Sequence, residues 1–323
     1  MTSSEEQAQT AARRGPLFIV HNAGAGAKDA QEEHKLIAEV FTEAGREFEF
    51  LPVADPSQIT QVAHRAVELA RARGGVVVAA GGDGTINAVA GAVLGSGCPF
   101  GVLPQGTFNY FGRANAIPQD ARAAATALLG ASISPVQVGQ VNGRSFLVNA
   151  SLGLYPQLLE DREAWKAQWG RSRFVAFISG IATLLQWGQQ LRLRIESGDK
   201  VAEFKTPTLF IGNNHLQLDR VGIEEAHVNA LEHGRLTGVA VRPIGTLALF
   251  GLLVRGLLGR LGDAENVDSF TFRRLTVTPR GLRRVKVATD GEIVWMQSPL
   301  VFQVADEPLL LLVPAPADRA EVA

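Results

Sequence analysis

The run of five apolar residues from Val76 to Ala80 constrains the fold more than any other feature of the sequence. A strand that is buried on both faces reads as a continuous apolar run, whereas a half-exposed strand alternates. Segments with helical spacing flank the run, from Pro56 to Arg73 before Gly74 and from about Thr85 to Leu94 after it. A buried strand between two helices is the repeating unit of a parallel sheet that is covered on both faces.

The same alternation extends over the first part of the chain. Further strands are predicted at 17–20, 48–53 and 100–103, and further helices at 29–44 and 119–129. After about residue 137, short alternating segments prevail, as in the antiparallel strands of a sandwich. They are Phe146–Val148, Leu191–Ile195, Thr208–Ile211, Leu275–Thr278, Val285–Ala288, Ile293–Trp295 and Val301–Val304. Two apolar stretches with helical spacing interrupt them, at about Phe174–Gln189 and Ile244–Leu261.

This change of pattern predicts two domains, which 323 residues can accommodate. We expect a disordered tail at 1–15 and an α/β domain with a parallel sheet, Rossmann-like or phosphofructokinase-like, at 16–140. An antiparallel β-sandwich domain is expected at 141–314, followed by a tail at 315–323.

Composition narrows the class of protein. Apolar residues make up 46% and charged residues 20% of the chain, as in ordinary soluble proteins, and a net charge of -1 argues against a nucleic-acid partner. A single cysteine, Cys98, excludes an intrachain disulfide and fits a reducing compartment. The polar N-terminus lacks the apolar stretch of a signal peptide, so a cytoplasmic location is predicted. Arg255 and Arg260 argue against a membrane span within the apolar stretch at 244–261.

The segment Gly81-Gly82-Asp83-Gly84-Thr85 follows the buried strand and opens the next helix. Glycines let the backbone turn sharply and approach a ligand closely, and the free N–H groups at a helix start favour a phosphate. Asp83 could hold a metal ion or accept a proton, and Thr85 could bind a phosphate oxygen. A tight turn capped by Asp83 or Thr85 explains the pentapeptide equally well.

A second loop shifts the balance toward a phosphate site. Leu103-Pro104-Gln105-Gly106-Thr107-Phe108-Asn109 follows the very next strand, so the two loops can converge at one edge of the sheet. A third candidate, Asn22-Ala23-Gly24-Ala25-Gly26, follows the first strand, although Gly-Ala turns are also a common way to end a strand.

In this order the three loops resemble the diacylglycerol kinase catalytic-domain family, which includes bacterial lipid kinases and the sphingosine and ceramide kinases. Asn149-Ala150-Ser151-Leu152-Gly153 resembles the family's segment that enters the second domain. Thr289-Asp290-Gly291-Glu292 resembles its late Asp-Gly-Glu motif. The likeness therefore covers roughly Pro16 to Pro314.

The resemblance implies a lipid kinase with a nucleotide domain, a β-sandwich domain and a cleft between them. The enzyme would pass the γ-phosphoryl group of ATP to the hydroxyl of a diacylglycerol-like or related lipid, in phospholipid biosynthesis. Mg²⁺ is expected to bridge the phosphate oxygens, because few basic side chains lie in these loops.

The resemblance also assigns roles to residues. The nucleotide phosphates would be held by Gly82, Asp83, Gly84 and Thr85, with Gly106, Thr107 and Asn109 completing the site and Asn22 and Gly24 beside it. Asp290 would take the proton from the alcohol, with Glu292 next to it. Asp83 is a rival for the base role within the family.

Spacing alone predicts that Asp290-Gly291 is a hairpin turn, because the pair lies between Val285-x-Val287 and Ile293-x-Trp295. The two interpretations are compatible, since the tip of a hairpin could present the carboxylate to a cleft.

Two positions depart from the family pattern. Tyr110 stands where bacterial lipid kinases usually carry an aspartate, which removes an acidic contact. His233 stands where the family often has an aspartate linked to a structural metal, so we expect a surface-turn histidine here and no accessory metal site.

A lipid substrate raises the question of membrane contact. Residues 271–289 carry six basic residues and no acidic one: Arg273, Arg274, Arg280, Arg283, Arg284 and Lys286. They could draw the protein to anionic headgroups at the inner membrane surface, or form a solvated strand face. The stretches Phe174–Trp187 and Leu249–Leu261 could wall an acyl-chain pocket or simply cover the core. A homodimer is a further hypothesis.

Two alternative functions share part of the pattern. An NAD kinase-like or phosphofructokinase-like enzyme has a Gly-Gly-Asp-Gly loop and a soluble acceptor, but the Leu-Pro-x-Gly-Thr-x-Asn loop argues against it. A catalytically inactive nucleotide-binding regulatory protein is favoured only by Tyr110 and His233.

Overall fold

The computed structural model describes residues 8–10, 12, 14–22, 27–153, 190–220, 222–243 and 266–321. The chain forms two compact units, one of Met1–Val138 with Asp306–Ala323 and the other of Gly139–Ala305. The two helical stretches predicted at Phe174–Gln189 and Ile244–Leu261 lie outside the described residues, as does Gly24.

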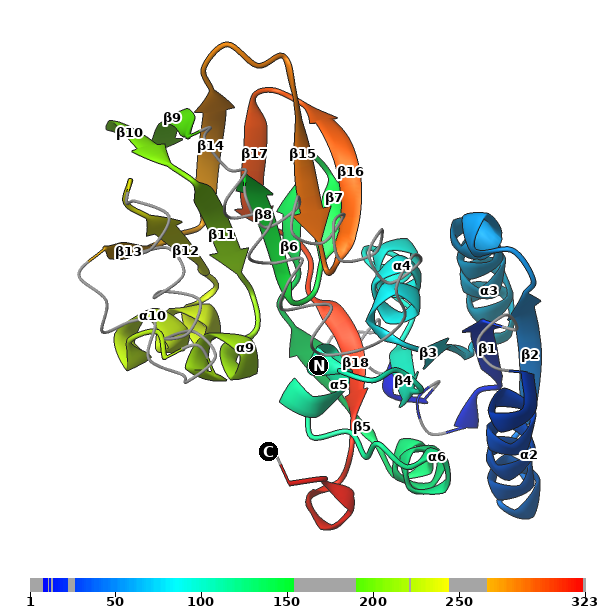
Figure 1. Ribbon diagram of the computed structural model, residues 1–323. Helices are drawn as coiled ribbons and strands as arrows, with labels where there is room; N and C mark the ends of the chain where they lie inside the picture. Colours follow the sequence, from blue (N-terminus) through cyan, green and yellow to red (C-terminus); the bar gives the residue numbers. More distant parts are fainter. Residues whose placement is uncertain are drawn as a thin grey trace. The chain divides into compact units, whose positions relative to one another are not determined.

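The first unit is built on a six-stranded sheet with the order β2-β1-β3-β4-β18-β5 (Figure 1). Its strands are β1 (Leu17–Asn22), β2 (Phe48–Val53), β3 (Val76–Gly81), β4 (Phe100–Pro104), β5 (Ser132–Val136) and β18 (Leu309–Val313). Neighbouring strands are parallel except for β5, which pairs antiparallel with β18. Every residue of β3 is buried, as the apolar run predicted. The α/β fold class is therefore confirmed.

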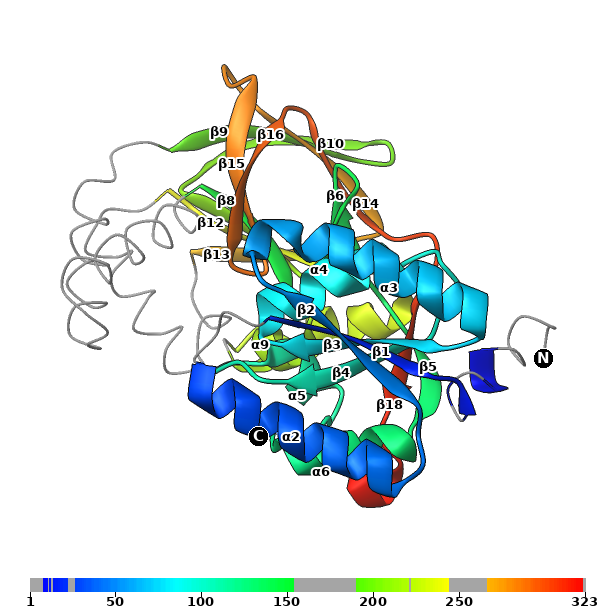
Figure 2. The same cartoon turned by 90° about the vertical axis from the view of Figure 1, so that its right-hand side faces the viewer.

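Helices cover both faces of this sheet (Figure 2). On one face α2 (Ala27–Glu43) packs beside α6 (Ala121–Leu129), and on the other α3 (Ile59–Arg73) packs beside α4 (Asp83–Val93). The short helices η1 (Pro56–Gln58), α5 (Tyr110–Ala114) and η3 (Pro316–Asp318) complete the unit. Helix α3 ends at Gly74, whose φ of 59° lies in the left-handed region, so the predicted stop signal is correct.

Two expected boundaries differ from the structure. The sequence placed residues up to 314 in the second domain, whereas β18 pairs with β4 and β5 in the first sheet. A short apolar run identifies a buried strand but not the sheet that it joins. The expected disordered tail at 1–15 also differs, because Ala8 and Ala12 are buried and Arg46 donates a 2.9 Å hydrogen bond to the Ala12 carbonyl.

The second unit is an antiparallel β-sandwich, which confirms the predicted class. One sheet has the order β10-β9-β14-β17-β6-β7 and the other β13-β12-β11-β8-β15-β16. The first comprises β6 (Gly139–Val141), β7 (Arg144–Phe146), β9 (Leu191–Ser197), β10 (Lys200–Thr206), β14 (Arg274–Pro279) and β17 (Leu300–Val304). The second comprises β8 (Asn149–Gly153), β11 (Thr208–Gly212), β12 (Leu236–Val241), β13 (Val267–Phe272), β15 (Arg284–Thr289) and β16 (Glu292–Gln297). Side chains of both sheets share one core, including Phe146 and Phe302 from the first and Leu152 and Phe272 from the second.

Three short helices lie beside the second sheet: α9 (His215–Arg220), α10 (Glu225–Asn229) and η2 (Ala230–His233). Leu218 and Val228 from these helices pack with Val239 of β12. His233 is exposed at the end of η2, and no group of three His, Cys, Asp or Glu side chains suited to a metal occurs within the described residues. None of the helices in the described ranges is long and apolar enough to span a bilayer.

A buried histidine pair lies at the end of β1. His21 is 7% exposed, and its ring meets His34 of α2 edge-on at a centroid distance of 4.1 Å and Phe50 of β2 at 5.4 Å. Burial, and secondly repulsion from His34, lower the pKa of His21 to about 4. His21 is therefore neutral in the folded protein at neutral pH.

This depressed pKa predicts acid destabilisation. Below the unfolded pKa of 6.5 the unfolded chain binds a proton that the folded protein refuses until about pH 4, so the free energy of unfolding falls as the pH drops through this window. The shift corresponds to about 3 kcal/mol. Urea titrations between pH 7 and pH 4 measure how the free energy of unfolding depends on pH. His21→Gln should lose the part of this dependence that comes from His21, whereas His64→Gln, on the exposed face of α3, should keep it. Identical slopes in the two variants would contradict the account.

Candidate functional site

Two loops leave the same edge of the first sheet. β3 and β4 are parallel neighbours, and Gly81 and Pro104 are paired at their ends. Past this pair, the Gln105 N–H donates a 2.9 Å hydrogen bond to the Gly81 carbonyl. The loops after β3 and β4 therefore begin side by side, as the sequence predicted.

The loops touch through glycine backbone. A Cβ on Gly106 would lie 2.7 Å from Gly82 Cα and 2.6 Å from Asn109 Oδ1, which is closer than real Cβ atoms approach. Gly81 is constrained in the same way, because a Cβ there would lie 2.7 Å from the Thr85 Cβ. Glycine at 81 and 106 is thus a condition for the two loops to pack.

Helix α4 begins directly at this contact. Its N-cap is Gly82, and no side chain within the described residues caps the helix. The expectation that Asp83 or Thr85 caps the turn is therefore wrong: Asp83 and Thr85 lie inside the first turn, and Thr85 is buried against Gly81. An uncapped helix start carries partial positive charge on its backbone N–H groups, which suits a phosphate.

Asp83 is the only carboxylate in these two loops. Its side chain is half-buried, and its Oδ1 has no hydrogen-bond partner among the described residues. Burial raises the pKa of Asp83 above its usual value, and the backbone N–H groups of Phe111, Asn109 and Tyr110 oppose the rise without cancelling it. A buried oxygen without a partner beside a helix start is a position for a ligand.

Asn109 closes the second loop. Its φ of 49° is left-handed, and its side chain is almost fully buried. Asn109 Oδ1 accepts the Gly106 N–H at 2.9 Å, while Nδ2 donates to the Gly106 carbonyl and to Gln119 Oε1, both at 2.8 Å. Gln119 is itself fixed by a 2.7 Å bond to the Ile117 carbonyl. Sequence reasoning missed Gln119, because nothing in the pattern links it to a loop ten residues earlier.

The tip of the second loop remains open. Gly106, Thr107 and Phe108 are exposed, and the Phe108 ring stacks on Tyr110 at a centroid distance of 5.8 Å and an angle of 6°. Tyr110, at the position where bacterial lipid kinases usually carry an aspartate, thus forms an aromatic pair with Phe108. Asn22 is the last residue of β1 and follows His21, which pairs with Ala80 of β3, so it lies at the same edge.

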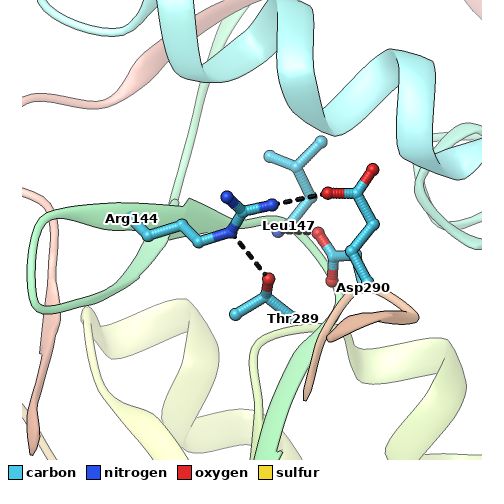
Figure 3. A network of polar contacts seen from close by, with 5 residues as sticks. Arg144, Leu147, Thr289 and Asp290 are labelled. Carbon is cyan, nitrogen blue, oxygen red and sulfur yellow. Dashed lines mark hydrogen bonds and ion pairs between the residues drawn. The ribbon is translucent and has the colours of Figure 1, made fainter. Parts of the chain in front are cut away.

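The second unit presents Asp290 in a hairpin turn, as the spacing predicted. Asp290 and Gly291 connect β15 to β16 with left-handed φ angles of 47° and 88°. The carboxylate accepts three backbone N–H groups: Leu147 at 2.7 Å on Oδ2, and Val148 and Asn149, both at 2.9 Å, on Oδ1. Figure 3 shows the Asp290 carboxylate directed toward Leu147.

These bonds explain why the strand predicted at Phe146–Val148 is wrong. β7 ends at Phe146 and β8 begins at Asn149, and the N–H groups of the two residues between them point to Asp290 instead of a neighbouring strand. Asn213 binds the two carbonyls on the other side, through its N–H to Val148 and its Nδ2 to Leu147, at 2.8 and 3.0 Å.

Arg144 braces both ends of the turn. Its guanidinium donates to Thr289 Oγ1 at 3.0 Å and pairs with Glu292 Oε2 at 2.5 Å (Figure 3). Glu292 is thus engaged with Arg144 beside Asp290. Asn149 donates to Gln217 Oε1 at 3.0 Å, while its own Oδ1 is buried without a partner in the described part of the chain. Nothing in the sequence pattern predicted that Arg144 and Gln217 contact these segments.

Comparisons with known proteins identify similar chains. A family model described as the diacylglycerol kinase catalytic domain matches residues 16–141. The diacylglycerol kinase of Bacillus subtilis strain 168 is 34% identical over 146 residues, which are 44% of this chain and 47% of that protein. A probable lipid kinase YegS-like of Pseudomonas aeruginosa is 39% identical over 140 residues, 42% of this chain and 43% of that one. These matches span about half the length of each relative.

Another curated relative matches over a longer stretch. The diacylglycerol kinase of Staphylococcus aureus strain JH9 is 31% identical over 216 residues, which are 62% of this chain and 67% of that protein. Two solved structures from Bacillus anthracis strain Sterne superpose with TM-scores of 0.72 and 0.67, at 19% and 18% identity. Each covers 94% of this chain and 98% of the other, and the second is described as a diacylglycerol kinase. At such identity the structural likeness concerns the fold.

The glycine contact makes a graded prediction. Gly106→Ala should lower the free energy of unfolding by about 1–3 kcal/mol, because its Cβ would collide with backbone that cannot rotate away. Gly82→Ala should cost about 1 kcal/mol or less, since its Cβ would lie 3.4 Å from Gly106 Cα, an ordinary contact. Denaturant unfolding of the two variants measures the difference. A Gly106→Ala protein as stable as Gly82→Ala would contradict the packing described here.

Proposed function

The chain belongs to the diacylglycerol kinase catalytic-domain family, and from that premise we propose an ATP-dependent kinase that phosphorylates the hydroxyl of a diacylglycerol-like lipid. The observation that supports the proposal most is the contact of Gly82 with Gly106 beside Asp83 and the start of α4. We place the enzyme on the cytoplasmic side of a membrane, where such a lipid would be reached.

The residues at this contact fit a nucleotide triphosphate tail. The first turn of α4, with Gly82, Gly84 and Thr85, offers backbone N–H groups to phosphate oxygens. Gly106 and Thr107 are exposed on the facing loop and can complete the cradle. Asn109 contributes by shaping this loop, since its amide is bound to Gly106 and Gln119.

Magnesium fits this site as a partner of the nucleotide. The described residues contain no group of three acidic or histidine side chains, so the phosphate oxygens would provide most of the ligands, with Asp83 the nearest carboxylate in the loops. When bound, Mg²⁺ neutralises part of the charge on the phosphate oxygens.

We assign the proton acceptor to Asp83 Oδ1. The lipid O–H would give its proton to this oxygen while the hydroxyl oxygen bonds to the γ-phosphorus and ADP departs with the bridging electrons. A base works best when its pKa approaches the working pH, and burial moves the pKa of Asp83 upward. Oδ1 has no hydrogen-bond partner among the described residues, so it can accept a proton without losing an existing bond.

We assign a positioning role to Asp290. Its two oxygens accept three backbone N–H groups, which bind the ionised carboxylate and tie the turn to residues 147–149. If the Asp290 carboxylate took up a proton, its hydrogen bonds to these backbone N–H groups would weaken. Glu292, paired with Arg144, supports the same turn.

The acceptor class can be tested directly. Labelled ATP and Mg²⁺ would be supplied with mixed micelles of diacylglycerol, phosphatidylglycerol, sphingosine or ceramide, with NAD as a soluble control. Label in a lipid product, foremost that of diacylglycerol, is expected. Label in NAD would support the soluble-acceptor alternative, and ATP binding without any labelled product would support an inactive regulatory protein; either result would overturn the proposal.

The assignment of the base predicts opposite behaviour of two matched variants. Asp83→Asn should lower kcat by about 100- to 10,000-fold, because it removes the proton acceptor. Thermal stability should change little, because the amide oxygen can keep the backbone N–H bonds while the NH2 group takes the place of Oδ1, which has no partner among the described residues. Asp290→Asn should cost about 1–3 kcal/mol of stability, because its amide presents an N–H donor to backbone donors, and the folded fraction should keep most of its activity. A stable Asp290→Asn protein without activity would contradict the assignment.

The pH profile gives a second readout of the base. Because Asp83 must be deprotonated to act, kcat/KM should rise with pH through the elevated pKa of this group. Asp290→Asn should retain this limb. Initial rates in micelles at saturating ATP measure this rise. If the rise with pH disappears in Asp290→Asn, the base is Asp290 and the assignment to Asp83 is wrong.

A further inference from the structure

The basic run at 271–289 divides into two parts in the structure. Arg280 pairs with Glu203 at 2.5 Å, Arg274 donates to Gln303 Oε1 at 2.6 Å, and Arg273 reaches the His233 carbonyl at 3.4 Å. These three guanidinium groups are engaged by the protein itself. The other three basic residues of the run, Arg283, Arg284 and Lys286, lie on and just before β15.

The second part gathers around an exposed tryptophan. Lys286 of β15 is paired in register with Trp295 of β16, and its Nζ lies 5.3 Å from the centre of the indole ring. The guanidinium of Arg284, two residues earlier on the same face of the strand, lies 5.8 Å from that ring. Val285 and Val287 point the other way into the core. One face of the β15–β16 hairpin thus presents an indole between two cations.

Apolar exposure adds to this charge. Large apolar side chains with high exposure are few within the described residues: Phe108, Val201, Leu282 and Trp295. Two of them lie here, since Trp295 is 55% exposed and Leu282, in the connection before β15, is 42% exposed. Arg283 follows Leu282 directly, and its carbonyl accepts the Ser298 N–H at 3.0 Å, which ties the connection to the end of β16. Figure 1 shows this connection between β14 and β15 projecting from the end of the unit.

We propose that Leu282, Arg283, Arg284, Lys286 and Trp295, hereafter the Trp295 surface, dock the protein on an anionic lipid bilayer. Indole rings favour the headgroup level of a membrane, where the ring is half in contact with hydrocarbon and half with water. Cations beside the ring meet the negative surface potential of anionic lipids. Leu282 would enter the acyl boundary beside them.

Charge complementarity selects this occupant. The whole chain has a net charge of -1, yet the Trp295 surface carries three positive charges. Glu292, which alternation along β16 places on the opposite face from Trp295, is paired with Arg144. A soluble polyanion would use the cations but would gain nothing from exposed Leu282 and Trp295. The inference rests on the proposed function, because a lipid acceptor requires the enzyme to reach a bilayer.

Vesicle flotation tests the surface. The full chain would be floated with vesicles of phosphatidylcholine alone and of phosphatidylcholine with one third phosphatidylglycerol, at low and at high salt. Binding is expected to the anionic vesicles only and to weaken with salt. Neutralising two cations in Arg284→Gln with Lys286→Gln should lower partitioning about 25-fold, since each contributes about fivefold. Trp295→Ser should lower it about tenfold.

Val201→Ser is the matched control, because Val201 is 54% exposed on β10 and lies outside the surface. It should float like the unchanged protein. Equal flotation of the Trp295 surface variants and this control, or equal binding of the unchanged protein to neutral and anionic vesicles, would overturn the inference.

Kinase activity in detergent micelles separates this test from the proposed function. Micelles deliver the lipid without a bilayer, so the Trp295 surface variants should keep the activity of the unchanged protein there. Reduced flotation with unchanged micelle activity supports docking through this surface. If the unchanged protein labels no lipid in micelles, the proposed function fails, whatever the flotation shows.

Discussion

The backbones of Gly82 and Gly106 meet without side chains between them, and the geometry of the candidate site depends on this contact. β3 and β4 end in register, so their loops start together, and glycine allows the loops to stay together beyond the sheet. The contact fixes where α4 begins and brings Asp83 next to the N–H groups of 109–111. Asn109 accepts the Gly106 N–H and is itself fixed by a hydrogen bond to Gln119. A phosphate would therefore meet donors that are already in place, which reduces the cost of binding.

Asp290 has a comparable organising role in the second unit. Two residues between β7 and β8, Leu147 and Val148, and the first residue of β8, Asn149, all direct their backbone N–H groups to Asp290. The carboxylate satisfies all three from the tip of a distant hairpin. This joins residues that are separated by more than 140 positions, as the Leu147 to Asp290 bond shows. An aspartate in a late motif can thus stabilise the fold through its hydrogen bonds to backbone N–H groups.

Local pattern predicted much of the fold and the neighbouring start of the two loops after β3 and β4. The run at Val76–Ala80, the stop at Gly74 and the Asp290-Gly291 turn depend on neighbours in sequence, and all three are confirmed. The errors have a different physical origin. Phe146–Val148 has the apolar character of a strand, but a distant carboxylate takes its N–H groups, and β18 joins its sheet through pairing that no periodicity encodes. Gln119 and Arg144 act through single side-chain contacts across the fold, which leave no pattern in the sequence.

The function that we propose depends most on the binding of phosphate groups between the start of α4 and the loop after β4. Backbone amide shifts in a transverse-relaxation-optimised NMR spectrum, with and without a non-hydrolysable ATP analogue and Mg²⁺, test it most directly. We predict that the amides of Gly82, Gly84, Thr85 and Gly106 move most, because the first three would donate to phosphate and the Gly106 amide, which donates to Asn109 Oδ1, lies on the facing loop. Large shifts elsewhere, with these four amides unmoved at saturation, would contradict it.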